Sequence, residues 1–203
     1  IRKEVLGEKH TDYATSLGLL GGLYRDQKKY YEAEPYVLKA LQIKKESLGE
    51  KHPDYLISLF DLGLLYELQD KHIQSEPLFL KTLILRKEIL GVNHPNYISN
   101  LFVLAHLYRI MELNDKSSIY YELFINANKK RILEDIYGLS EKELMNFIDL
   151  NKSMLFSPIS FLKDFPSIYP TINTSCFESE LLIKNLALRN QQLIKKVIQN
   201  NTN

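Results

Sequence analysis

The sequence predicts an all-α protein, in which a right-handed alpha-alpha superhelix of stacked helix pairs is followed by a helical region without repeats. Three observations lead to this prediction. An eight-residue connection occurs three times at a spacing of 42 residues, apolar residues at helical spacing follow each copy, and a second helical stretch comes after them. A fixed period of this length is typical of solenoids, in which each repeat packs on its neighbours.

The repeated connection reads LGEKHTDY at residues 6–13, LGEKHPDY at 48–55 and LGVNHPNY at 90–97. Its glycine suits the end of a helix, because the residue after a helix C-terminus often adopts a left-handed conformation. Its proline suits the first turn of the next helix, where the missing N–H is not needed. We therefore expect helices to end at Gly7, Gly49 and Gly91 and to begin at Pro53 and Pro95.

The first helix of each unit is predicted by apolar, small and tyrosine residues at positions i, i+3, i+4 and i+7, a pattern that starts at Leu17, Leu59 and Leu101. Small residues are expected where two helices approach closely, and the tyrosines of the connection are expected to fill the core. The second helices are predicted at Glu32–Leu48, Gln74–Leu90 and Lys116–Ile132. The small residues are Gly21, Gly63, Ala105, Ala33 and Ala40, and the tyrosines are Tyr13, Tyr55 and Tyr97.

These residues resemble the tetratricopeptide repeat family, whose signature is Leu-Gly-x-x-Tyr in the first helix and alanines in the second. The 42-residue period and the pairs Glu34-Pro35 and Glu76-Pro77 look like the kinesin-light-chain type. The resemblance covers residues 1–130 and implies three helix pairs. The third copy departs from the pattern, with Ser118-Ile119 in place of Glu-Pro, as is expected of a terminal repeat. Residues 131–203 are predicted to form a helical capping or spacer region.

The resemblance implies a function in protein–protein interaction and no catalysis. Repeats of this family hold a protein or peptide segment in a groove that the first helices line, so we expect an interaction scaffold. The groove positions carried over by register are Thr15, Gly18, Gly22, Arg25, Asp26, Ile57, Phe60, Leu64, Glu67, Leu68, Ser99, Phe102, His106, Arg109 and Ile110.

The groove of this chain is expected to be more apolar than that of its relatives. Relatives often carry an asparagine pair that hydrogen-bonds a bound peptide, and here those places hold Gly18-Leu19, Phe60-Asp61 and Phe102-Val103. One interpretation is that the aromatic residues bind an apolar face of a partner. The other is that they pack against the chain's own next segment. An uncovered patch of this kind would favour aggregation.

The last seventy residues are predicted to be helical without repeats. Ser140 and Glu143 form a capping box that begins one helix, and Ser175 with Glu178 begins the last one. The stretches 137–143 and 186–190 resemble the spacer that precedes a caspase-like (CHAT) protease domain. That resemblance implies an alternative function, as the regulatory or sensor arm of a protease whose catalytic domain lies outside this chain. Its partner would then be an RNA-guided effector complex. The chain also starts without methionine inside a helical pattern, so we expect a piece of a longer protein.

Composition argues against several other classes of function. The formal net charge is +1 and no basic stripe is present, although direct nucleic-acid binding requires one. No apolar stretch approaches the roughly 18 residues of a membrane-spanning helix. The single Cys176 excludes an internal disulfide and fits a cytoplasmic protein. The sequence leaves the oligomeric state open.

Catalytic, cofactor and metal sites are also not expected. Cys176 has no histidine after it in the sequence to act as a base, and phosphate-binding loops are missing. The acidic pairs Glu32/Glu34 and Glu141/Glu143 are interpreted as solvated faces or caps. The connection histidines are too far apart to share a metal ion, so we interpret them as loop-capping residues. These histidines are His10, His52 and His94.

Overall fold

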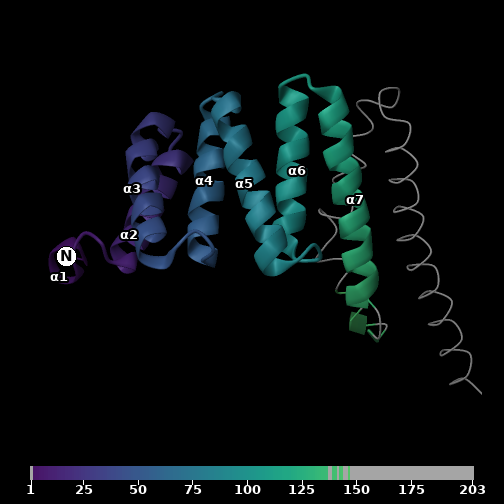
Figure 1. Ribbon diagram of the computed structural model, residues 1–203, viewed down its shortest axis with the longest axis horizontal. Coiled ribbons are helices and arrows are strands. Elements are labelled where there is room, and N and C mark those ends of the chain that lie inside the picture. The colour runs from purple at the N-terminus through teal and green to yellow at the C-terminus, as the bar shows by residue number, and fades with distance from the viewer. Residues whose placement is uncertain (1, 137–138, 141, 144–145, 147–203) are drawn as a thin grey trace, which may run out of the picture. The chain divides into compact units, whose positions relative to one another are not determined.

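The computed structural model describes residues 2–136, 139–140, 142–143 and 146, and within them the assigned secondary structure is α-helical (Figure 1). This confirms the all-α fold class. The helices are α1 (Arg2–Leu6), α2 (Thr11–Asp26), α3 (Tyr30–Leu48), α4 (Pro53–Leu68), α5 (His72–Leu90), α6 (Pro95–Ile110) and α7 (Asn114–Ile136). The helices predicted between residues 147 and 203 lie outside the described residues.

The chain divides between Ser117 and Ser118 into two compact units. The first unit holds α1 to α6 and the start of α7, and its helices follow one another as stacked antiparallel hairpins (Figure 1). Helices α2 and α3 form the first pair, and α4 and α5 form the second. Helix α7 continues without interruption past residue 130 to Ile136.

Each first helix begins at a histidine cap. The Nδ1 atoms of His10, His52 and His94 accept the backbone N–H of the residue two positions later, each over 3.1 Å. Pro53 and Pro95 occupy the first turn, as predicted. The capping interpretation of the histidines is therefore confirmed, and because Nδ1 accepts, the proton of each neutral ring lies on Nε2.

The second helices begin two residues earlier than predicted, at Tyr30, His72 and Asn114. The reason is the tight end of each first helix. Lys28 has a φ of 61°, and its backbone N–H bonds back to Arg25 while the next N–H reaches Tyr24. This is the Schellman motif, which reverses the chain within a few residues. Its left-handed position usually holds glycine and is filled here by Lys28, Asp70 and Glu112.

Small residues set the distance between the two helices of a pair. A Cβ atom added to Gly63 would lie 2.6 Å from the ring of Phe79, and one added to Gly21 would lie 2.7 Å from Val37. Both distances are shorter than any normal carbon–carbon contact, so these positions must remain glycine for the helices to pack as they do. The predicted close approach is confirmed, and Ala33, Ala40 and Ala105 are fully buried as well.

Candidate functional site

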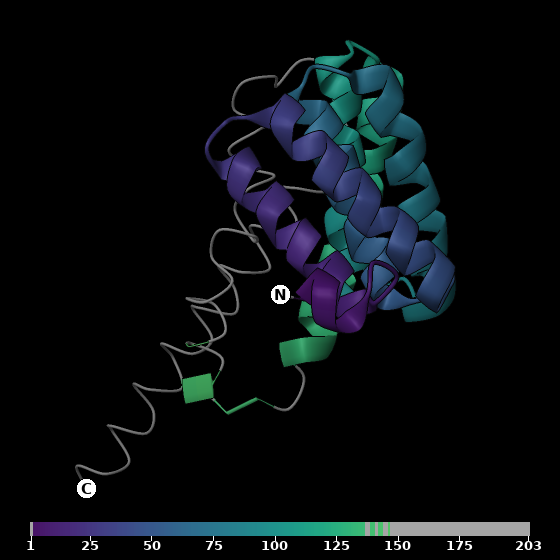
Figure 2. The same cartoon turned by 90° about the vertical axis from the view of Figure 1, so that its left-hand side faces the viewer.

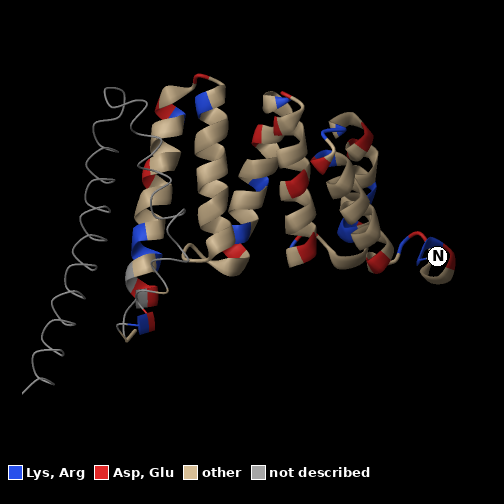
Figure 3. Ribbon diagram, turned by 180° about the vertical axis from the view of Figure 1, so that it is seen from behind, with Lys and Arg blue, Asp and Glu red and all other residues tan. Residues whose placement is uncertain are grey.

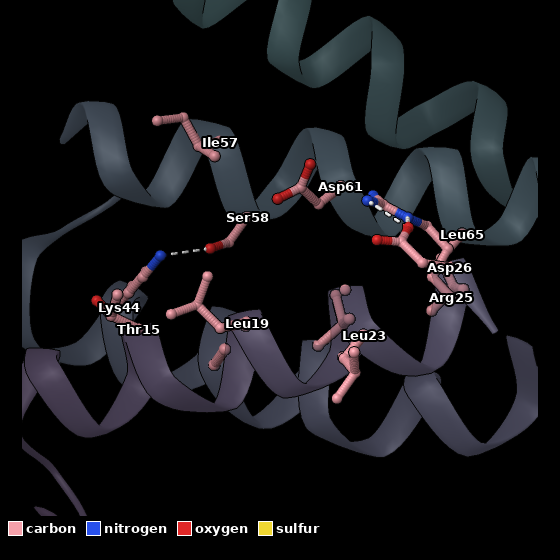
Figure 4. Close-up of a pocket in the computed structure, with 15 residues that line it drawn as sticks. Thr15, Leu19, Leu23, Arg25, Asp26, Lys44, Ile57, Ser58, Asp61 and Leu65 are labelled. Carbon is pink, nitrogen blue, oxygen red and sulfur yellow. Dashed lines mark hydrogen bonds and ion pairs between the residues drawn. The ribbon is translucent and has the colours of Figure 1, made fainter. Parts of the chain in front are cut away.

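The first helices line two neighbouring cavities. The first cavity, of about 470 Å³, lies between α2 and α4 (Figure 4). Six of the predicted groove positions line it, together with side chains that the register did not include. The predicted ones are Thr15, Gly18, Gly22, Arg25, Asp26 and Ile57, and the additional ones include Leu19, Leu23, Lys44, Ser58 and Asp61.

The second cavity, of about 510 Å³, continues from the first. Arg25 lines both cavities, so they adjoin along the first helices of the three repeats. Besides Arg25, four predicted groove positions line this cavity, and Asp70 and His72 complete it. The four are Leu64, Glu67, Leu68 and Ile110. We call the two cavities together the first-helix groove.

Apolar side chains are exposed in the first-helix groove. Leu19 is 70% exposed, Ile57 47% and Leu68 44%, and each of them lines one of the two cavities. Burial of a leucine or isoleucine contributes about 1.5–3 kcal/mol. A partner that covers several of these side chains would therefore gain much of its binding energy from them.

Charged groups form part of the groove floor between α2 and α4. The ammonium group of Lys44 is buried and donates to the Ser58 hydroxyl over 2.9 Å. Burial raises the pKa of the Asp61 carboxyl above its usual value, and the positive charges of Arg25, Lys44 and Arg86 oppose that rise. The lining of the first cavity thus combines the charged residues Arg25, Asp26, Lys44 and Asp61 with exposed apolar side chains.

Phe60 lies outside both cavities, although sequence register placed it in the groove. Its ring packs on Phe79 of α5 at a centroid distance of 5.3 Å, and the Arg86 guanidinium lies 4.2 Å from the ring centroid. This arrangement favours the interpretation that the phenylalanine packs within its own chain. Phe102 is half-buried and lies outside the two cavities too.

Three further predicted positions lie on α6. Both ring nitrogens of His106 are contacted: Glu67 Oε1 lies 3.2 Å from Nδ1, and a guanidinium nitrogen of Arg109 lies 3.0 Å from Nε2. Since arginine only donates, Nε2 accepts and the Nδ1 proton points to Glu67. These hydrogen bonds join α4 to α6 beside the second cavity, which Glu67 lines. The hydroxyl of Ser99 donates to the backbone carbonyl of Asn96.

Sequence reasoning overlooked a series of cations that recurs with the 42-residue period. Arg2, Lys44 and Arg86 each lie four residues before the last residue of their helix and donate to the first half of the next first helix. Their acceptors are equivalent too, since Ser16 bonds Arg2 and Ser58 bonds Lys44. Aligning the three repeats and looking for basic residues in the same column would have found this series.

The interpretation of Glu34 as a solvated residue was wrong. Its carboxylate is half-buried and accepts from Tyr66, Gln69 and Lys71 over 3.2, 3.1 and 2.9 Å. Glu32, the other member of the pair, is exposed as expected. The cap interpretation of Glu143 is confirmed, because its carboxylate accepts both the backbone N–H and the hydroxyl of Ser140.

Charge is mixed over the molecule. Figure 3 shows basic and acidic residues interspersed on α2 to α5, whereas the charged residue of α6 is Arg109. Within the described residues, no group of three or more histidine, cysteine or acidic side chains could hold a metal ion. Among the helices that the structure describes, none is both long and apolar enough to span a bilayer.

Comparisons with known proteins agree with this architecture. Residues 12–79 match the tetratricopeptide repeat family. The fold is similar to the crystal structure of BtubC (BKLC) from P. vanneervenii, with 14% sequence identity and a TM-score of 0.61 over 92% of this chain. The chain spans 66% of the length of that protein.

A Podosopora anserina protein of the kinesin light chain type, with nearly identical TPR-like repeats, has 15% identity and a TM-score of 0.55. That match covers 95% of this chain and 98% of the other. The comparison with curated proteins gave no match. Residues 12–79 thus match the tetratricopeptide repeat family, and the chain has the fold of a helical solenoid similar to these two repeat structures.

Proposed function

We propose that this chain is a protein-interaction scaffold that binds a segment of a partner protein in the first-helix groove. The observation that carries the proposal is the row of exposed apolar side chains in two adjoining cavities. Leu19 belongs to α2, and Ile57 and Leu68 belong to different turns of α4. All three side chains are exposed and line one of the two cavities. Monomeric proteins rarely leave such a row uncovered without a binding role.

The groove favours a segment with apolar side chains on one face and hydrogen-bond donors on the other. The apolar face would cover Leu19 and Ile57. Asp61 is already desolvated in part, as its raised pKa indicates, so a partner that covers it must supply a donor. A segment that lacks a donor at this point would leave a buried carboxylate unsatisfied and bind poorly.

The test is selection of binding peptides by the full chain, followed by comparison of two matched variants. Ile57→Asp places a charge in the groove, while Ile84→Asp places one at a 65% exposed site on α5 that lies outside both cavities. We expect the selected peptides to lose binding to Ile57→Asp and to retain binding to Ile84→Asp. Equal binding to both variants would refute the groove as the site, provided that circular dichroism shows both to be folded.

A further inference from the structure

The carboxylate of Asp61 lines the first cavity without a hydrogen bond or ion pair to the part of the chain that the structure describes. Asp61 is half-buried, and Figure 4 shows it on α4 between Ser58 and Arg25, across the cavity from α2. Glu34 is half-buried as well, but it accepts three hydrogen bonds. Partial burial of a charge that has no partner is unfavourable, so this carboxylate is poised to receive a donor.

Three cations act on Asp61, but each of them is engaged by another group. The Arg25 guanidinium contacts the carboxylate of Asp26 over 3.3 Å, and the Lys44 ammonium donates to a serine hydroxyl over 2.9 Å. Arg86 donates to a backbone carbonyl of α6 over 2.8 Å and lies outside the cavity. Burial raises the pKa of Asp61, and the three charges lower it by less. The carboxylate therefore still gains from a further positive charge.

Exposed apolar side chains lie in the same cavity as Asp61. Leu19 and Leu23 belong to α2, whose pair with α3 faces the viewer in Figure 2, and Ile57 belongs to α4. These three side chains are 70%, 55% and 47% exposed. Lysine and arginine pack their aliphatic stems on apolar surface and keep the charged end at a polar group. A cavity that combines apolar side chains with one available carboxylate fits such a residue.

The charge of the first cavity does not oppose a basic ligand. Its charged lining residues are two cations, Arg25 and Lys44, and two carboxylates, Asp26 and Asp61. Arg25 and Asp26 pair with each other, and Lys44 is 8% exposed. Asp61 is therefore the charge in this cavity that is best placed to receive a ligand.

We propose that Asp61 determines the specificity of the first-helix groove by binding the charged end of an arginine or lysine side chain of the partner segment. The stem of that side chain would cover Leu19, Leu23 and Ile57. A neutral donor would leave the carboxylate charge uncompensated once the partner closes the cavity, and charge-assisted hydrogen bonds are the stronger ones. Arginine should bind more tightly than lysine, because its planar guanidinium can donate two parallel hydrogen bonds to one carboxylate. This inference rests on the proposed function, since it concerns the same groove.

The test uses the full chain and a labelled peptide, selected from a random library, whose binding Ile57→Asp abolishes. Each arginine of the peptide is replaced in turn by citrulline, which is neutral and of similar shape, and each lysine by norleucine. We expect one of these replacements to weaken binding to the native chain roughly tenfold in fluorescence anisotropy. The same replacement should have little effect on binding to Asp61→Asn, because the charge that it pairs with is already absent.

The matched control is Asp54→Asn, which removes an exposed carboxylate from the same helix, outside both cavities. This variant should keep the full sensitivity to the peptide replacement. NMR titration of the Asp61 carboxyl gives a readout that needs no variant. Its pKa should fall when the native chain binds the basic peptide and should not fall with the neutral peptide.

The outcomes separate this inference from the groove proposal. If Ile57→Asp abolishes binding but the replacement weakens binding to the native chain and to Asp61→Asn equally, the groove stands and the role of Asp61 is overturned. Selected groove peptides without a basic residue, or an Asp61 pKa that the basic peptide leaves unchanged, would also overturn that role alone. If no selected peptide is lost with Ile57→Asp, both proposals fail.

Discussion

The hydroxyl of Tyr66 donates to the carboxylate of Glu34 over 3.2 Å and so joins the first helix of one repeat to the second helix of the repeat before it. The next repeat has the same relationship, because Tyr108 donates to Glu76 over 2.7 Å. Burial raises the pKa of the Glu34 carboxyl, but the hydrogen bonds from Lys71, Gln69 and Tyr66 outweigh it, and the pKa lies below its usual value. The carboxylate therefore remains charged and bridges the repeats.

Glu34→Gln should destabilise the solenoid. The substitution removes the charge that Lys71 pairs with, and it leaves the half-buried Tyr66 and the buried Gln69 to donate to a weaker acceptor. Loss of a charge-assisted hydrogen bond costs about 1–3 kcal/mol in the free energy of unfolding. Urea unfolding followed by circular dichroism measures the change. The matched control is Glu32→Gln, which alters an exposed glutamate on the same helix. If the two variants were equally stable, the bridge would have no energetic role.

Gly63→Ala should be destabilising while Gly18→Ala should be tolerated. The added methyl group at Gly63 would lie 2.6 Å from the fully buried Phe79 ring, so the pair of helices must separate. Overpacking of this kind costs about 1–3 kcal/mol. At Gly18 no side chain or other helix lies within 4 Å of the added group, except its immediate chain neighbours, so better helix propensity should stabilise by up to about 1 kcal/mol. Thermal melts of the two variants give the comparison, and a stable Gly63→Ala would show that the packing distance is not fixed there.

His52→Ala should lower stability through loss of an N-cap. The His52 Nδ1 atom accepts the N–H of Asp54 over 3.1 Å at the start of α4. Removal of a side-chain cap costs about 0.5–2 kcal/mol. His52→Asp keeps an acceptor at this position, so its unfolding midpoint should exceed that of His52→Ala. If both variants lost the same amount of stability, His52 would stabilise α4 through packing and not through the N-cap hydrogen bond.

Glu50 should contribute stability that is lost in acid. Hydrogen bonds from Lys45 and Lys81 lower the pKa of its carboxyl from the usual 4.5 to about 2. A carboxyl whose pKa is lower in the folded state stabilises the fold above its unfolded pKa. That contribution declines as the pH falls from about 4.5 towards 2.

The difference in Tm between the native chain and Glu50→Gln should therefore shrink across this pH range. Melts recorded at several pH values test this, and NMR titration of the Glu50 side chain measures the pKa directly. A carboxyl that titrates in its usual range would contradict the two lysine contacts. Replacing Lys81 by methionine should raise the pKa, because one of the two hydrogen bonds is removed.

The repeat architecture could be predicted because local chemistry determines it. The glycine at a helix end, the proline in a first turn and the small residue at a close approach each depend on backbone geometry that one residue type satisfies best. Gly49 and Gly91 end α3 and α5 with φ of 82° and 83°, as their sequence context indicated. The starts of the second helices were displaced by two residues because Lys28 and its equivalents adopt a conformation that usually requires glycine.

The side-chain contacts between repeats could not be predicted from local pattern. Glu34 and Lys71 lie 37 residues apart, and both belong to types that are mostly exposed. Phe60 shows the same limit, since register places it on the first helix, while its ring orientation depends on Phe79 and Arg86 of α5. Thr15, Arg25 and Ile57 line the groove as register predicts, because their helix positions alone determine which way they face.

The central proposal for this protein is that its first-helix groove binds a protein segment. The most direct measurement is photo-crosslinking, with a photoreactive residue introduced either at Ile57 in the groove or at Ile84 on α5, in the presence of a selected binding peptide. Binding in the groove should give crosslinks from position 57, which are lost on competition with unlabelled peptide, and none from position 84. Crosslinks from position 84 alone would place the peptide on the second helices and contradict binding in the first-helix groove.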